Sequence, residues 1–226
     1  MGADLGVVFD GAAERIILVD ELAREIQPDV ALRLLLHLVA RHAPRGGRVV
    51  LPTNVSRLAE RAVQGEGLEV VRSGTNASSL MAAAAADGVV FAGSPDGGFI
   101  FPSFIPGFDA IMSVAKVLEL LALEAKPLSA LCAAVPAASL VHEQAPVPWS
   151  LKGLAMRELG ERVREIRVEP ADGIRVEEDG GWAQLVPDPD EPLFHIYAEG
   201  RDGSESRRLA GHYRALIEEV LAEAET

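Results

Sequence analysis

A short acidic loop near the carboxyl end of the chain is its most distinctive chemical feature. It reads Pro-Asp-Pro-Asp-Glu-Pro over residues 187–192 and carries the carboxylates of Asp188, Asp190 and Glu191. A phosphate dianion close to one carboxylate is repelled by roughly 4 kcal/mol at an effective dielectric constant near 20. The proline between the two aspartates also removes a backbone amide that could donate to an anion. The loop is therefore expected to favour a cation or a basic side chain over phosphate.

Strand-like and helical segments alternate through the first part of the chain. Short apolar runs bounded by turn residues predict strands, and apolar residues spaced three and four apart predict helices. The strands are expected at 5–9, 15–20, 48–51, 68–72 and 88–92, and the helices at 28–42, 53–64, 78–86 and 111–124. Thr53 and Asn54 read as the start of the second helix. This alternation is typical of an α/β unit with a largely parallel sheet.

The character of the sequence changes after residue 136. Residues 136–149 contain several prolines and are expected to form a linker or a strand bounded by prolines. Beyond them, a helix is expected at 152–164, strands at 173–178, 182–186 and 194–198, and a final helix at 206–223. This order predicts a smaller α+β module with an antiparallel sheet, and hence a second domain.

The acidic loop and its flanking strands resemble the last domain of the phosphohexomutases, which interconvert hexose 1- and 6-phosphates. In that family the loop reads Arg-Pro-Ser-Gly-Thr-Glu-Pro and holds the substrate phosphate. Here Pro187, Glu191 and Pro192 are kept, whereas Val186 takes the place of the arginine. The resemblance spans essentially the whole chain and implies that it is the carboxyl-terminal piece of a longer protein.

The same resemblance implies a domain plan. The expected parts are a hairpin remnant of a preceding mutase-like domain at 1–22, an α/β third domain at 23–140 and an α+β fourth domain at 147–226. In the family, the serine that carries the phosphoryl group lies near the start of the full-length enzyme. That region is expected to lie outside this chain, so no catalytic residue is assigned to it.

Two further loops match the family with changes. The metal loop of the family reads Asp-Gly-Asp-Ala-Asp-Arg, and here it keeps two carboxylates, Asp10 and Glu14. Because magnesium prefers near-octahedral oxygen coordination, we expect residual magnesium binding at most, and no required cofactor. The sugar-selecting loop of the family aligns with residues 93–98, where Ser94 and Asp96 could hydrogen-bond a sugar. Either loop could instead be a plain turn between strands.

Composition argues against several other classes of protein. The net charge of −13 disfavours nucleic acid and anionic membranes as partners. The single cysteine, Cys132, supports neither a disulfide framework nor a thiolate metal site, so a reducing cytoplasmic compartment is expected. The five histidines are widely scattered in the sequence, which argues against a zinc site.

We interpret the chain as a catalytically degenerate phosphomannomutase-like module. Residues 147–157, together with the acidic loop, also resemble the mutase-like carboxyl-terminal region of bacterial mannose-1-phosphate guanylyltransferase-type proteins. That resemblance implies a regulatory, ligand-sensing or assembly role beside an upstream nucleotidyltransferase domain or other subunits. The expected ligand is a sugar nucleotide or a sugar phosphate. Two alternatives stay open, namely the carboxyl-terminal half of an active phosphomannomutase/phosphoglucomutase and a purely structural oligomerisation module.

Overall fold

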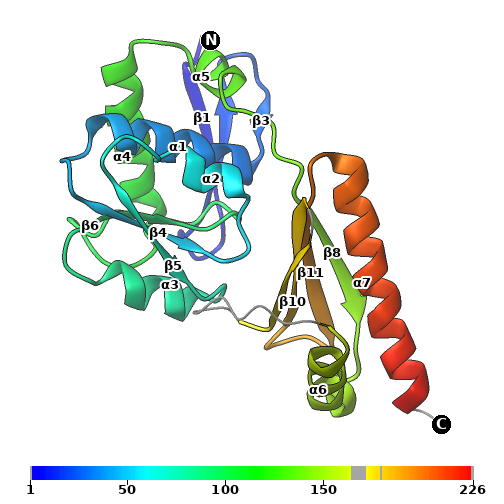
Figure 1. The fold of residues 1–226 in the computed structure, drawn as a ribbon. Helices are drawn as coiled ribbons and strands as arrows, with labels where there is room; N and C mark the ends of the chain where they lie inside the picture. Colours follow the sequence, from blue (N-terminus) through cyan, green and yellow to red (C-terminus); the bar gives the residue numbers. More distant parts are fainter. Residues whose placement is uncertain (1, 164–171, 179, 225–226) are drawn as a thin grey trace. The chain divides into compact units, whose positions relative to one another are not determined.

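The chain forms two compact units, Met1–Ala137 and Ala138–Thr226, in a computed structural model that describes residues 2–163, 172–178 and 180–224 (Figure 1). The first unit is α/β and the second is a smaller α+β module, so the fold class predicted from the sequence is confirmed. Among the described residues, no helix combines the length and the apolar character needed to cross a membrane.

A four-stranded sheet forms the centre of the first unit, in the order β5-β4-β6-β7. The strands are β4 (Arg48–Pro52), β5 (Glu69–Ser73), β6 (Val89–Gly93) and β7 (Phe99–Ile100). The first three run parallel, and β7 pairs antiparallel with β6. Successive side chains of β4 point to opposite faces, so Val49 and Leu51 join one hydrophobic cluster and Val50 joins another.

Helices cover both faces of this sheet (Figure 1). They are α1 (Pro28–His42), α2 (Arg57–Arg61), α3 (Ala77–Ala84), α4 (Ala110–Glu124) and α5 (Leu128–Ala133). Leu32, Leu35 and Leu36 of α1 lie in the larger cluster with Leu51, whereas Leu80 of α3 lies with Val50. Burial on both faces explains why the central strands are apolar along their whole length.

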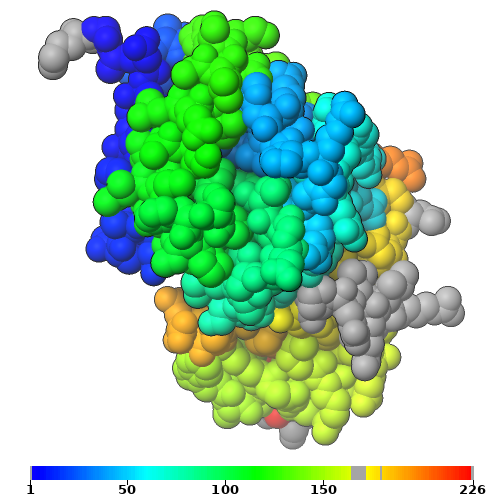
Figure 2. All heavy atoms as spheres, turned by 90° about the vertical axis from the view of Figure 1, so that its left-hand side faces the viewer, coloured from blue at the N-terminus to red at the C-terminus, as the bar shows by residue number. Residues whose placement is uncertain are grey.

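A three-stranded antiparallel sheet, β1 (Leu5–Phe9), β2 (Ile16–Asp20) and β3 (Glu25–Ile26), completes the first unit. Ile16 and Leu18 are buried in the larger cluster, whereas Val8 and Phe9 are exposed. In Figure 2 the blue strands lie beside the green helix α4, which contacts β2 and exposes Ile111. The assignment of residues 1–22 to a preceding domain, like the rest of the domain plan, stays a prediction.

The second unit is built on a four-stranded antiparallel sheet in the order β8-β11-β10-β9. Its elements are β8 (Val141–Pro146), a 3₁₀ turn (Trp149–Leu151), α6 (Lys152–Arg162), β9 (Ile174–Glu178), β10 (Gly181–Pro187), β11 (Leu193–Glu199) and α7 (Gly203–Ala224). Tyr213, Ile217 and Val220 form an apolar stripe on α7 that packs on the sheet with Phe194 and Ile196. The opposite face of this sheet carries Trp182 and polar side chains, of which Gln184 and Arg175 are buried as well.

One local expectation needs correction, one is confirmed, and some short elements were not predicted. The second helix begins at Arg57 rather than at Thr53, because the Ser56 hydroxyl caps it by accepting a hydrogen bond from Leu58 N at 3.1 Å. Of the two expectations for the proline-bounded segment, a linker or a strand, the strand is confirmed, because β8 joins the sheet beside β11. Four short elements were not predicted, namely β3, β7, α5 and the 3₁₀ turn Trp149–Leu151, because runs of two to six residues carry too little periodicity.

Candidate functional site

Arg15 joins the two predicted loops of the first unit. Its Nε lies 2.8 Å from Asp96 Oδ2, and its Nη1 lies 3.6 Å from both Asp10 Oδ2 and Glu14 Oε2. The β1–β2 turn and the loop after β6 are therefore brought together around one guanidinium. Ile16 N also donates to Gly97 O at 3.0 Å, which fixes the loop after β6 against the start of β2.

Asp10 organises the β1–β2 turn. Its Oδ1 accepts hydrogen bonds from Glu14 N at 2.8 Å and from Arg15 N at 3.1 Å. Within the turn, between Asp10 and Glu14, Ala13 has a left-handed φ of 54°. These backbone hydrogen bonds lower the pKa of Asp10 below its ordinary value, and the bond from Arg15 N has the largest effect. The carboxylate thus favours its ionised form, and its Oδ1 already accepts two hydrogen bonds from backbone amides of the same turn.

The residues of this turn do not fit a magnesium ion in this arrangement. Two carboxylates, Asp10 and Glu14, are available, and both face the Arg15 guanidinium, which is itself a cation. Magnesium requires open oxygen ligands in octahedral geometry. Within the described ranges there is no group of three or more His, Cys, Asp or Glu side chains that could hold a metal ion. We therefore assign no chemical step to magnesium.

The loop after β6 satisfies its own polar groups. The Ser94 hydroxyl contacts Asp96 Oδ1, and Gly98 N donates to the same oxygen at 3.3 Å. Burial opposes ionisation of Asp96, but hydrogen bonds from Ser94 and Arg15 outweigh it and leave the pKa of Asp96 below its ordinary value. A sugar hydroxyl would have to share these groups with Arg15 or displace it.

The acidic loop of the second unit, residues 187–192 between β10 and β11, is closed by its own side chains. Asp188 Oδ1 accepts hydrogen bonds from the amides of Asp190 and Glu191, each at 2.7 Å. The Lys152 ammonium, at the start of α6, contacts the carbonyl oxygens of Asp188 and Glu191. Two amides that converge on one point form an anion-binding arrangement, and here the Asp188 carboxylate is the anion that they hold.

Two histidines that are distant in the sequence meet beside this loop. His142 Nε2 lies 2.9 Å from His195 Nδ1, and His195 Nε2 lies 2.8 Å from Asp188 Oδ2. The ring of His142 stacks on Tyr197 with 4.4 Å between centroids. The histidines are scattered in the sequence, as stated above, but the fold brings these two side chains into contact. The missing information was the pairing of β8 with β11, which places position 142 diagonally across from position 195.

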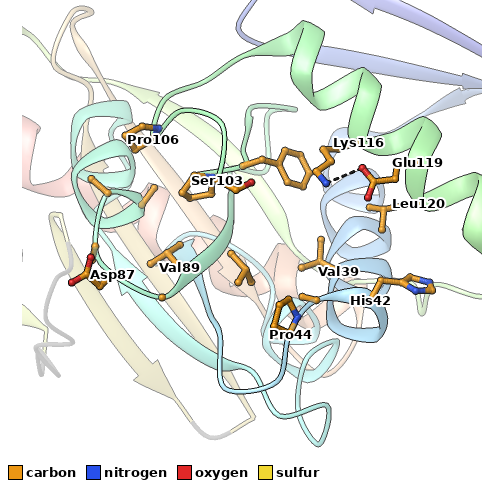
Figure 3. A pocket seen from close by; sticks show the side chains of 18 residues that line it. Val39, His42, Pro44, Asp87, Val89, Ser103, Pro106, Lys116, Glu119 and Leu120 are labelled. Atoms are coloured by element: carbon orange, nitrogen blue, oxygen red, sulfur yellow. Dashed lines mark hydrogen bonds and ion pairs between the residues drawn. The ribbon is translucent and has the colours of Figure 1, made fainter.

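A cavity of about 520 Å³ lies elsewhere in the first unit, between the ends of α1 and α3 and the side of α4 (Figure 3). Val39, Val89 and Leu120 line it with apolar surface. Lys116 and Glu119 form an ion pair of 2.8 Å at its edge. No predicted site residue is among those that line it.

Comparisons with known proteins show what this chain is similar to. Residues 27–138 match the family model described as phosphoglucomutase/phosphomannomutase, alpha/beta/alpha domain III. A probable phosphoglucosamine mutase of Methanopyrus kandleri is 33% identical over 224 residues, which are 96% of this chain and 49% of that protein. A phosphoglucomutase/phosphomannomutase of Thermococcus kodakarensis is 29% identical over 98% of this chain and 48% of its own length. The chain thus spans about half the length of these curated relatives.

Solved structures show the same fold. A phosphoglucomutase/phosphomannomutase family protein from Burkholderia thailandensis superposes with a TM-score of 0.79 at 24% identity, covering 97% of this chain and 47% of that one. An N-acetylphosphoglucosamine mutase from Aspergillus fumigatus, crystallised with GlcNAc-6P and magnesium, gives 0.67 at 16% identity and covers 93% and 51%. These relatives are named as mutases and not as guanylyltransferases, so the finer resemblance drawn from residues 147–157 stays a prediction. Residues 27–138 are therefore similar to the α/β/α domain III of the phosphoglucomutase/phosphomannomutase family.

Proposed function

We propose that the chain is the carboxyl-terminal half of a phosphohexomutase that binds a hexose or hexosamine phosphate. The observation that carries this proposal is the likeness to a probable phosphoglucosamine mutase along 96% of the chain, at 33% identity. It favours the mutase alternative over a part of a nucleotidyltransferase. The group that carries the phosphoryl moiety would be supplied by the other half of the longer protein.

In this proposal the loop after β6 contacts the sugar. The Ser94 hydroxyl and the Asp96 carboxylate offer a donor and acceptors on a loop that Gly97 and Ile16 hold in place. Short polar groups on a stiff loop suit the recognition of sugar hydroxyls. Arg15 would orient Asp96 through its 2.8 Å contact and would share that carboxylate with the ligand.

A second candidate function is a non-catalytic module that senses a sugar phosphate or sugar nucleotide, or promotes assembly with other subunits. The occupied acidic loop favours it, because Asp188 already holds the amides of Asp190 and Glu191, so that neither amide is free to hold a phosphate. A nucleotidyltransferase partner and a purely structural oligomerisation role belong to the same class of hypothesis.

Isothermal calorimetry separates these candidates. The intact chain is titrated with glucosamine 6-phosphate, glucose 1-phosphate, mannose 1-phosphate and GDP-mannose. A mutase half is expected to bind a sugar phosphate, and Asp96→Asn is expected to weaken that binding at least tenfold. The matched control is Asp87→Asn, which changes an exposed aspartate at the end of α3 away from the loop. Heat with GDP-mannose alone would support the sensing module, and no heat with any ligand would contradict ligand binding altogether.

Activity is then tested by mixing. The chain is combined with the amino-terminal half of a related phosphoglucosamine mutase, and conversion of hexosamine 6-phosphate to the 1-phosphate is followed. Turnover that requires both halves would establish the mutase proposal. Binding without turnover would leave the chain as a sensing module.

A further inference from the structure

The His142–His195 pair has the arrangement of two metal ligands supported by a carboxylate. Asp188 accepts a hydrogen bond from His195 Nε2 at 2.8 Å, and an ionised carboxylate can only accept. The proton of a neutral His195 therefore resides on Nε2, which leaves a lone pair on Nδ1. That nitrogen points to His142 Nε2 at 2.9 Å.

A carboxylate that accepts from the second ring nitrogen is the usual companion of a metal-binding histidine. It fixes the tautomer and the ring orientation and makes the ligating nitrogen more basic. Asp188 is itself held by two backbone amides and lies half-buried, so it is a fixed support.

The distance between the rings suits a shared metal ion after a small movement. Two imidazole nitrogens at the usual zinc distances and a tetrahedral angle lie roughly 3.3 Å apart. At 2.9 Å the two nitrogens share a hydrogen bond, in which His142 Nε2–H donates to the lone pair of His195 Nδ1. A metal ion would take the place of that proton, and the two rings would have to part by a few tenths of an ångström and turn so that both lone pairs meet at the ion. His142 is exposed on the edge strand β8, which leaves its ring room to turn.

We propose that His142 and His195 form a two-histidine site for a divalent transition-metal ion such as zinc or copper, with Asp188 as the residue that orients His195. Water completes the coordination, because the described residues contain no group of three or more metal-binding side chains. The proposal does not rest on the proposed mutase function or on magnesium, although Asp188 belongs to the acidic loop that aligns with the phosphate loop of the family.

The test is a zinc titration of the intact chain by calorimetry, followed by electron paramagnetic resonance of the copper form. His142→Ala and His195→Ala are each expected to weaken zinc binding at least tenfold, and Asp188→Asn by on the order of tenfold through the lost orientation. The matched control is His212→Ala, an exposed histidine on α7, which is expected to leave the affinity unchanged.

The copper spectrum is expected to report two coordinated imidazole nitrogens in the parent chain and one in either histidine variant. Circular dichroism shows whether each variant keeps its fold, and His142→Gln replaces the alanine variant if it does not. Zinc affinity that is equal in the parent, His142 and His195 variants, or a copper spectrum without two imidazoles, would overturn the proposal.

Discussion

At the scale of single residues, Arg15 links the β1–β2 turn to the loop after β6 through its ion pairs. Its guanidinium faces Asp10, Glu14 and Asp96, so its removal leaves three carboxylates without their common cation. We expect Arg15→Gln to lower the free energy of unfolding by about 1 kcal/mol, because the groups are partly exposed and solvent screens them. Urea denaturation measures the change. Arg45→Gln, at an exposed position on another loop, is expected to have little effect, and equal losses in the two variants would contradict the bridging role.

Asp96 should make the stability of the chain depend on pH. Its folded-state pKa lies below the unfolded value near 4, so its contribution is fully present above that value and is lost as the pH falls through the lower folded pKa. Asp96→Asn removes this dependence. The stability difference between parent and variant, measured by urea denaturation, is therefore expected to shrink between pH 6 and pH 3. A difference that stays constant over that range would show that Asp96 is not stabilised by Ser94 and Arg15.

The sequence identifies the polar loops but not the contacts between them. Asp10, Ser94 and Asp188 stand out as polar residues next to strand-like runs, and the structure places each of them in a loop at a strand end. The link from Arg15 to Asp96 spans 81 positions and depends on how β2 lies against the loop after β6. The meeting of His142 with His195 depends in the same way on a strand register that side-chain alternation alone does not fix.

At the scale of elements, Gly97 sets the distance between the loop after β6 and β2. Its φ is +93°, and a Cβ there would lie 2.5 Å from the carbonyl oxygen of Ile16. We expect Gly97→Ala to destabilise the chain by roughly 2 kcal/mol or more, because both the backbone conformation and the close approach are lost. Thermal unfolding measures it. Gly11→Ala is the matched control, since no heavy atom lies within 4 Å of its Cβ position. Comparable destabilisation of both variants would contradict a specific role for Gly97.

Element prediction succeeds where one physical signal is strong. The apolar stripe and the initial proline predict the helix at 28–42, and α1 is observed as Pro28–His42. The prediction fails at 53–64 because Thr53 and Asn54, although good helix caps, are buried in the turn after β4, and Ser56 provides the cap instead. A cap residue marks a helix start only if the chain can enter a helix at that residue. The tertiary structure, here the buried turn after β4, sets where the chain can do so.

At the scale of the whole molecule, the two units have separate hydrophobic cores. One core includes Leu35 and Phe91 with other residues of the first unit, and another includes Phe194 and Ile217 of the second. We expect fragments 1–137 and 138–226 each to fold alone and to unfold cooperatively in circular dichroism and urea denaturation. Failure of one fragment to unfold cooperatively would mean that its core is stable only within the intact chain.

If the two fragments fold independently, they also show which unit binds the sugar phosphate and which binds zinc. If the loop after β6 is sufficient for sugar contact, fragment 1–137 should be stabilised by a sugar phosphate, by about 2.7 kcal/mol at 100 times the dissociation constant. Fragment 138–226 should not respond to the sugar phosphate, because Asp188 occupies the amides of Asp190 and Glu191, whereas zinc should stabilise it through His142 and His195. A zinc response from fragment 1–137 alone, or a sugar-phosphate response from fragment 138–226 alone, would reverse the assignment of the two ligands. The two responses depend on different residues in different units, so either can fail without the other.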